Sequence, residues 1–489
     1  MSTSTAPLLA LALDRRGAEP LNRQLYAELR QAILSGRAKP GQRLPATRTL
    51  ADELGLSRNT VQAAIDQLSA EGYVEGRIGS GTYVTTVLPD RVLSVGAAPR
   101  DAVPMPAPAR LSARGRAIVG AAQERPPAHP TFALGLPDLE GFPSAAWGKL
   151  MMRWWRHPVR SLWTARDPGG WEPLRAAIAD YLRAVRGLTL SPEQVIVTSG
   201  AQQGLDLVAR VLLDPGDAVW VEEPGYAGLK LAMIAAGARP VPVAVDGEGL
   251  SVEDGMRRAP DARLIAVSPS HQFPLGITMS LARRLALIDW AAQRQAWILE
   301  DDYNSEYRYA GRPLAALQGL ESHGRVIYVG SFSKVLFPSL RLGYLVAPAG
   351  LVESFRRARQ AMDDHPSIVA QPVVAEFIAS GQFAAHVRRM RARYQARQAA
   401  LVSAVRKQLD GQLAVEPNAA GMHLVGRLPD DVDDRELAAR AAAERVTVTP
   451  LSQYYSGGKP QRGLLLGYAA AGERQIAAGI ERLARVLEK

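Results

Sequence analysis

The sequence of 489 residues contains no cysteine. This absence excludes disulfide bonds and thiolate-bound metals, and it favours a reducing compartment. Long apolar runs are also missing near the start. The longest there, APLLALAL at residues 6–13, follows no basic segment and is too short to span a bilayer. We therefore expect a cytoplasmic protein without a membrane segment, and we assign no metal site.

What the sequence does have is an excess of positive charge. The net charge is +10 and the isoelectric point is about 9.8, which suits an acidic partner such as DNA. The length predicts two or three domains. A hydrophobic share of 47% is ordinary for a chain with a large core.

The first segment, residues 12–86, has the pattern of a winged helix-turn-helix. Apolar residues recur every four positions over residues 21–33 and predict a first helix. A short helix over residues 47–54 follows, and then a helix that Ser57 caps. The stretch YVEGRIGSGTYV at residues 73–84 predicts two short strands around a glycine-rich turn, which is a hairpin.

In such folds the second helix of the pair inserts its N-terminal end into the major groove of DNA. A small helical domain used only for dimerisation would have a similar pattern. However, residues 44–84 closely resemble the GntR-family DNA-binding domain, which implies binding to double-stranded operator DNA. The DNA-contacting residues that we predict are Arg43, Arg48, Ser57, Arg58, Asn59, Thr60, Gly79 and Gly81.

The middle segment, residues 87–130, has eight prolines among Ala and Arg, and we expect an extended, semi-rigid linker there. Over residues 131–489, β-rich runs such as QVIVTSG and AWILEDDY alternate with helical stretches. This alternation predicts an α/β unit with a largely parallel sheet and crossover helices.

The last segment offers candidates for the parts of a pyridoxal 5'-phosphate site. Such a site must form a Schiff base, keep the ring nitrogen protonated and sandwich the ring. Lys334, set between serines in SFSKVLFPSLRLG, is the candidate for the aldimine and for catalysis. We assign Asp301 to the ring nitrogen and Tyr303 to the ring oxygen. Tyr226 is the candidate for stacking on the ring.

The same site must also bind a dianionic phosphate. Serines and an arginine flank the lysine, and the arginine fork suits a phosphate. In VTSGAQQGL a strand ends and a helix begins, so backbone amides there face an anion at a helix N-terminus. Each feature alone also fits an ordinary turn or helix start, but here they occur together. The candidates are Ser331, Ser333, Arg341, Gly200, Ala201 and Gln202.

Residues 131–489 resemble the fold-type I aminotransferases. The motifs EDDYNSEYRY, SPSHQFPLG and SFSKVLFPSLRLG are most similar to the aminotransferase-like half of MocR-type regulators of the GntR family. The resemblance implies a large and a small domain, and a head-to-tail homodimer with cofactor sites near the subunit interface. The expected fold class is therefore multidomain, a winged helix-turn-helix followed by an α/β fold-type I unit.

Three positions depart from the aminotransferase pattern. Leu465 stands where an arginine usually clamps the substrate α-carboxylate. Ala165 replaces a tyrosine that reaches the partner subunit's phosphate, and Phe273 replaces an asparagine near the ring oxygen. The nearby residues that we consider as substitutes are Arg462, Trp163, His271 and Gln272.

The leading hypothesis is a transcriptional regulator that senses pyridoxal phosphate, or an amine or amino-acid effector, at Lys334. One alternative is an active aminotransferase that carries a DNA-binding domain. Another is a large domain retained only for dimerisation. The missing clamp favours a regulator over an enzyme. It also favours a ligand without an α-carboxylate, or sensing of the cofactor itself.

Overall fold

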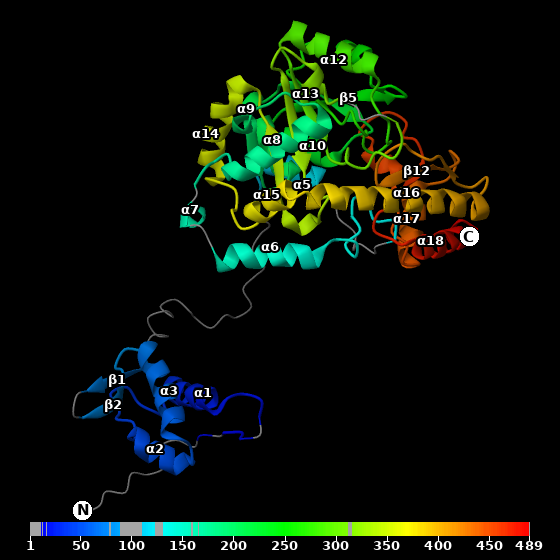
Figure 1. Cartoon of the computed structure of the whole chain (residues 1–489). Coiled ribbons are helices and arrows are strands. Elements are labelled where there is room, and N and C mark those ends of the chain that lie inside the picture. Colours follow the sequence, from blue (N-terminus) through cyan, green and yellow to red (C-terminus); the bar gives the residue numbers. More distant parts are fainter. Residues whose placement is uncertain are drawn as a thin grey trace, which may run out of the picture. The chain divides into compact units, whose positions relative to one another are not determined.

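The structure is a computed structural model that describes residues 11, 13–15, 17–77, 80–88, 110–122, 131–157, 160–164, 166–311 and 315–488 (Figure 1). It forms two compact units, residues 1–109 and residues 110–489. None of the helices among these described residues has both the length and the apolar character that crossing a bilayer requires.

The first unit is a three-helix fold with a two-stranded wing, which confirms the helix-turn-helix and the hairpin. Gly55 ends the second helix in a left-handed conformation with φ +61°, which favours glycine. The core includes the apolar stripe predicted for α1, with Leu25, Leu29 and Ile33, and it also includes Val61, Ile65 and Leu68 of α3. The elements are α1 (Leu21–Leu34), α2 (Thr47–Leu54), α3 (Arg58–Ala70), β1 (Val74–Arg77) and β2 (Gly81–Val84).

A helix lies inside the segment that we predicted as an extended linker. This helix, α5 (Ala113–Ala121), begins after Ser112, whose hydroxyl accepts a hydrogen bond from the Gly115 amide at 2.9 Å. It packs against α10 (Ala227–Ala236) and belongs to the second unit. The prediction of an extended linker is therefore wrong for these residues. The rest of that prediction falls mostly on residues 89–109 and 123–130, outside the described ones.

The second unit is built on a mixed sheet with the strand order β3-β10-β9-β8-β7-β4-β5-β6. The strands from β9 to β5 run parallel, as predicted, while β10 is antiparallel to both neighbours and β6 to β5. In chain order the strands are β3 (Val195–Thr198), β4 (Ala218–Glu223), β5 (Arg239–Asp246), β6 (Gly249–Leu250), β7 (Leu264–Val267), β8 (Trp297–Asp302), β9 (Val326–Ser331) and β10 (Gly343–Val346).

Helices cover both faces of this sheet, because its strands place apolar side chains on both sides. Along β4, Val219 and Val221 pack with α9, α10 and α14, whereas Trp220 packs on the opposite face with α11 and α12. The helices are α6 (Ser144–Arg156), α7 (Arg160–Trp163), α8 (Glu172–Arg186), α9 (Ala201–Leu212), α11 (Val252–Arg258), α12 (Leu281–Arg294), α13 (Leu317–Leu320), α14 (Val352–Asp363) and α15 (Gln371–Ala379).

The C-terminal part of the same unit is a smaller α/β layer, drawn in gold, orange and red in Figure 1. Its antiparallel sheet has the order β11-β12-β14-β13, and helices α16 and α18 pack on each other beside it. The elements are α16 (Gln382–Gln408), β11 (Ala414–Val415), β12 (His423–Arg427), α17 (Asp434–Ala443), β13 (Thr449–Pro450), β14 (Gly463–Gly467) and α18 (Glu473–Leu487).

Candidate cofactor site and nucleic-acid interface

Lys334 lies just after the end of β9, where the carboxyl ends of the parallel strands meet. Its Nζ donates a hydrogen bond to the Gly135 carbonyl oxygen at 3.1 Å. Gly135 has φ +64°, and a Cβ on it would lie 2.1 Å from Nζ. A side chain at position 135 would therefore displace the lysine amine from this place, and the positive φ also favours glycine.

Asp301, at the end of the neighbouring strand β8, is buried and incompletely paired. It is 4% exposed, and its Oδ1 has no hydrogen-bond partner. Burial, with the nearby Asp302, raises the pKa of Asp301 to about 7, while Lys334 acts in the opposite direction. A protonated pyridine nitrogen would supply both the missing donor and a compensating charge. Asp301 thus fits the predicted role.

Tyr303 follows β8 and contacts His271, its Oη lying 3.0 Å from Nδ1. Burial, helped by nearby His423, lowers the pKa of His271 to about 3, so the ring is neutral. Its Nε2 lies 3.2 Å from the Ala420 carbonyl oxygen, which can only accept. We therefore place the ring proton on Nε2, so that Nδ1 accepts the Tyr303 hydroxyl proton.

Of the two residues considered as substitutes for the missing asparagine, the structure leaves only His271 beside Tyr303. The Gln272 side chain instead forms hydrogen bonds with backbone groups. Its Nε2 donates to the carbonyl oxygens of Pro224 and Phe273 at 2.8 and 2.6 Å. Its Oε1 accepts from the Leu275 amide at 3.0 Å. Gln272 therefore shapes the loop, and Phe273 supplies an aromatic ring in the asparagine's place.

Arg341 and the start of α9 come together at the other end of the site. Arg341 donates to the Ser199 carbonyl oxygen at 3.0 Å. Gly200 precedes α9 with φ +93°, and a Cβ there would lie 3.5 Å from the Arg341 guanidinium carbon. A guanidinium beside a helix N-terminus suits a phosphate. The Ser331 hydroxyl accepts from the Ser333 amide at 3.2 Å, which leaves its own proton available to an anion.

The first residues of α9 differ in what their side chains do. Ala201 offers only its backbone amide to an anion. The Gln202 side chain donates to the Gly228 carbonyl oxygen at 2.7 Å, so it ties α9 to α10. Gln202 would therefore contribute to phosphate binding through its backbone amide alone.

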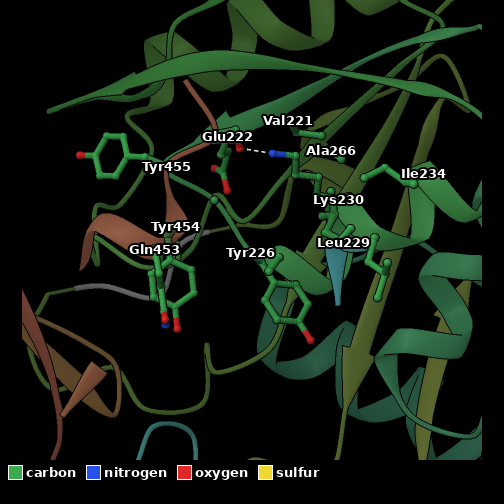
Figure 2. A pocket seen from close by; sticks show the side chains of 15 residues that line it. Val221, Glu222, Tyr226, Leu229, Lys230, Ile234, Ala266, Gln453, Tyr454 and Tyr455 are labelled. Atoms are coloured by element: carbon green, nitrogen blue, oxygen red, sulfur yellow. Dashed lines mark hydrogen bonds between the residues drawn. The ribbon is translucent and has the colours of Figure 1, made fainter. Parts of the chain in front are cut away.

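Tyr226 directly precedes α10, its side chain forms no cap hydrogen bond, and it is 38% exposed, so part of the side chain is accessible for stacking. It borders a cavity of about 140 Å³, which Glu222, Lys230 and Tyr454 also line. Figure 2 shows these side chains around one hollow. Burial raises the pKa of Glu222 to about 8, despite opposing hydrogen bonds from the Ser268 amide and Gln272.

The predicted DNA-reading end of α3 begins at an ordered cap. The Ser57 hydroxyl accepts from the Thr60 amide at 3.1 Å, and the two hydroxyls lie 2.8 Å apart. The cap is confirmed, and it means that both hydroxyls already serve the helix start. Arg58 and Asn59 are exposed beside it, and Arg48 is exposed on α2.

Arg43 lies beside the wing rather than on the first helix of the pair. Its backbone forms a β-bridge with Tyr83, and a Cβ on Gly81 would lie 2.9 Å from the Arg43 Nε. Gly81, with φ +112°, starts β2. Gly79 lies outside the described residues. The wing and Arg43 therefore form one basic corner, which Arg77 extends by stacking 4.7 Å from the Tyr83 ring.

Comparisons with known proteins match both units. Residues 159–483 match the family of aminotransferase class I and II, and residues 21–84 match the bacterial regulatory proteins of the gntR family. The probable rhizopine catabolism regulatory protein MocR of Rhizobium meliloti is 44% identical over 474 residues, which cover 97% of this chain and 95% of that protein. The chain is a MocR-type regulator of the GntR family.

Two further proteins are similar to this chain, one over both units and one over the second unit. The HTH-type pyridoxine biosynthesis transcriptional regulator PdxR of Corynebacterium glutamicum is 32% identical over 95% of both chains. Kynurenine aminotransferase of Pyrococcus horikoshii has a TM-score of 0.68 and 28% identity, and the match covers 73% of this chain and 90% of that one. The second unit thus has the fold-type I aminotransferase fold, and the GntR domain implies DNA binding.

Some features of this MocR-type regulator were not predicted from the sequence. Arg77, at the basic corner, was not predicted because a lone arginine in a hairpin is only a weak sign of DNA contact. In the structure it forms an ion pair with Glu75 at 2.8 Å. Glu222 precedes the Pro-Gly-Tyr loop and was not predicted as a site residue.

Trp163 was considered as a substitute for the tyrosine that Ala165 replaces. It is 57% exposed, and its ring centroid lies 5.3 Å from that of Trp155. Ala165 lies outside the described residues.

Proposed function

We propose that this MocR-type protein is a regulator that binds pyridoxal phosphate at Lys334 and changes its DNA affinity with the state of that site. The single observation that carries the proposal is the buried carboxyl of Asp301, whose Oδ1 has no hydrogen-bond partner and which is close enough to Lys334 for the lysine to affect the pKa of Asp301. A buried carboxyl oxygen without a partner lowers stability. A protonated pyridine nitrogen bound beside Asp301 would account for the presence of this buried carboxyl.

The remaining roles follow from the positions of the side chains. When bound, pyridoxal phosphate supplies an aldehyde that condenses reversibly with primary amines. Arg341 and the amides at the start of α9 would hold its phosphate, and Tyr226 would cover its ring. Tyr303, whose hydroxyl proton goes to His271, would accept from the ring hydroxyl, and it could donate to the ring oxygen only by releasing His271.

A route from this site toward the DNA-binding unit is provided by α5. Tyr226 directly precedes α10, and α5 packs on α10, with Ala121 lining the same cavity as Tyr226. No residue of α5 is buried, and a helix of nine residues is marginal alone. Its folding therefore depends on α10. An effector that favours one state of α10 would shift the population of docked α5 and, through the chain before it, DNA binding.

We further propose a head-to-tail homodimer in the cytoplasm, as the resemblance to aminotransferases implies. Two copies would present two helix-turn-helix units to one operator, with Arg48, Arg58 and Asn59 facing the DNA. An active aminotransferase remains the second candidate, because Lys334 could also move protons. Leu465 in the position of the carboxylate clamp makes that candidate the weaker one.

The test uses the visible absorption of the full-length protein with added pyridoxal phosphate. We expect a band that Lys334→Ala lacks, and borohydride reduction should fix the cofactor on the peptide that contains Lys334. A band of equal strength in Lys334→Ala would contradict the proposal. Sustained release of a carbonyl product over many turnovers with an amino donor would instead support the enzyme.

A further inference from the structure

Strand β14 turns one leucine away from the core of the smaller layer. Leu464 and Leu466 belong to that core, together with Leu424 of β12. Leu465 lies between them, and successive side chains of a strand point to opposite faces. Leu465 therefore points to the other face, where it is completely buried.

That other face looks toward the candidate cofactor site. Leu465 pairs with Val425 of β12, and two residues along, Gly467 pairs with His423. The His423 ring lies 5.5 Å from the ring of Phe273, and its Nε2 is 2.9 Å from the Pro274 carbonyl oxygen. Lys334 is close enough to lower the pKa of His423. Position 465 thus lies on the ligand side of β14.

The two residues paired with Leu465 across the sheet offer no charge to a carboxylate. Leu465 is flanked by Val425 on one strand and Thr449 on the other. Moving a carboxylate from water to such a place without a cation is unfavourable, because the charge loses its hydration without gaining a partner. Position 465 thus remains on the ligand side, but the leucine there cannot bind a carboxylate as the usual arginine would.

Two basic residues near this region are already engaged. The Arg462 guanidinium is 3.2 Å from Asp434 and 3.7 Å from Asp433, and three residues along the strand it falls on the opposite face from Leu465. Lys230 donates to the Ser456 hydroxyl. Neither is positioned as a replacement for the clamp.

Aromatic rings form much of the remaining wall. Phe273 packs edge to face against Tyr226, Tyr303 and Tyr454, with ring centroids 6.0, 6.2 and 5.0 Å away. Aromatic faces attract cations, and the buried carboxyl of Glu222 in the adjoining cavity adds an acid rather than a base. These surfaces suit an amine better than a zwitterion.

We propose that the effector is a primary amine with no carboxylate on its amino-bearing carbon, and that Leu465 sets this specificity. The inference rests on the proposed function, because it names the ligand class of the Lys334 site. An amine would place its nitrogen at the cofactor and its carbon skeleton against Leu465, Val425 and Phe273. The corresponding α-amino acid would bury an unpaired carboxylate there.

The test titrates the cofactor-loaded protein with matched pairs that differ only in this carboxylate: tyramine and tyrosine, isoamylamine and leucine, cadaverine and lysine. The shift of the visible band reports binding. We expect at least one amine to bind about tenfold or more tightly than its amino acid. Equal or tighter binding of the amino acid in every pair would overturn the proposal.

Leu465→Arg restores the clamp and should reverse the preference by at least about tenfold. The control Gln412→Arg adds the same charge at an exposed position of the same layer and should leave the preference as it is. If Leu465→Arg does not fold, the wild-type comparison alone decides. Arg308 has a buried Nε without a partner. A preference for amino acids that Arg308→Gln abolishes would assign the carboxylate to Arg308 and refute the proposal.

The same titration separates failure of this inference from failure of the proposed function. A protein that forms no Lys334-dependent band contradicts the cofactor site itself. A protein that forms the band and whose band shifts only with amino acids keeps the cofactor site and loses the amine specificity. The two results cannot be confused, because the first is read before any ligand is added.

Discussion

Asp301→Asn should make the cofactor-free protein more stable at pH 8 while it weakens cofactor binding. Asp301 is buried, and its pKa is raised from 3.8 to about 7. The folded state therefore holds a proton that the unfolded state releases near pH 4. Between these values the unfolded state binds fewer protons, so wild-type stability falls as the pH rises from about 4 to about 7.

The size of this loss follows from the two pKa values. Each pKa unit corresponds to about 1.4 kcal/mol, so the change from 3.8 to about 7 amounts to about 4 kcal/mol. Asparagine does not titrate, so the variant escapes the loss. The free energy of unfolding of Asp301→Asn relative to wild type should rise by roughly that amount between pH 4 and pH 8.

The assay is urea unfolding of the cofactor-free protein across this pH range, at fixed protein concentration. Asp302→Asn is the matched control, one residue along. The Asp302 carboxylate lies 2.7 Å from Arg186 and accepts from the Tyr328 hydroxyl at 2.6 Å, so its loss should cost about 3–5 kcal/mol. A pH-independent effect of Asp301→Asn would refute the reasoning. The variant should also bind pyridoxal phosphate roughly 10- to 100-fold more weakly.

Two further predictions concern DNA binding. Arg58→Ala should weaken operator binding and reduce the salt slope by about one unit, with the cofactor band unchanged. An unaltered slope in a salt titration would remove Arg58 from the phosphate contacts. Ala117→Pro should unfold α5 and uncouple operator affinity from the effector, whereas Ala113→Pro, at the first helical position, should preserve the coupling. Equal coupling in both variants, measured by anisotropy, would exclude α5 as the route.

Sequence patterns predicted the elements whose signals are local. The cap at Ser57 located α3, and β-rich runs located strands of the central sheet such as β3 and β8. Strand β5 was not predicted, because Pro240 and Pro242 interrupt it. The sheet tolerates these prolines because β5 is hydrogen-bonded to β4 on one side and has only the short strand β6 on the other. α5 was missed because its sequence has almost no apolar stripe, and its partner α10 is more than a hundred residues away.

In the candidate site, too, the features with local sequence signals were predicted and those that depend on distant contacts were not. The residue types of Lys334, Asp301 and Arg341, each within a short motif, were enough to indicate a cofactor. Contacts across the fold did not follow from spacing. Gly135 is almost 200 residues from the lysine that it accommodates, and His271 meets Tyr303 only because two strand ends converge. That position 465 faces the ligand side follows from the pairing of β14 with β12, which no local pattern contains.

The most direct measurement is the affinity of the full-length protein for operator DNA selected from a random library, with and without pyridoxal phosphate and a band-shifting ligand. For the wild type, we expect the cofactor, the ligand or both to change the dissociation constant by about tenfold or more. In Lys334→Ala neither addition should change it. The same response in both proteins, or none in either, would contradict a regulator governed by the Lys334 site.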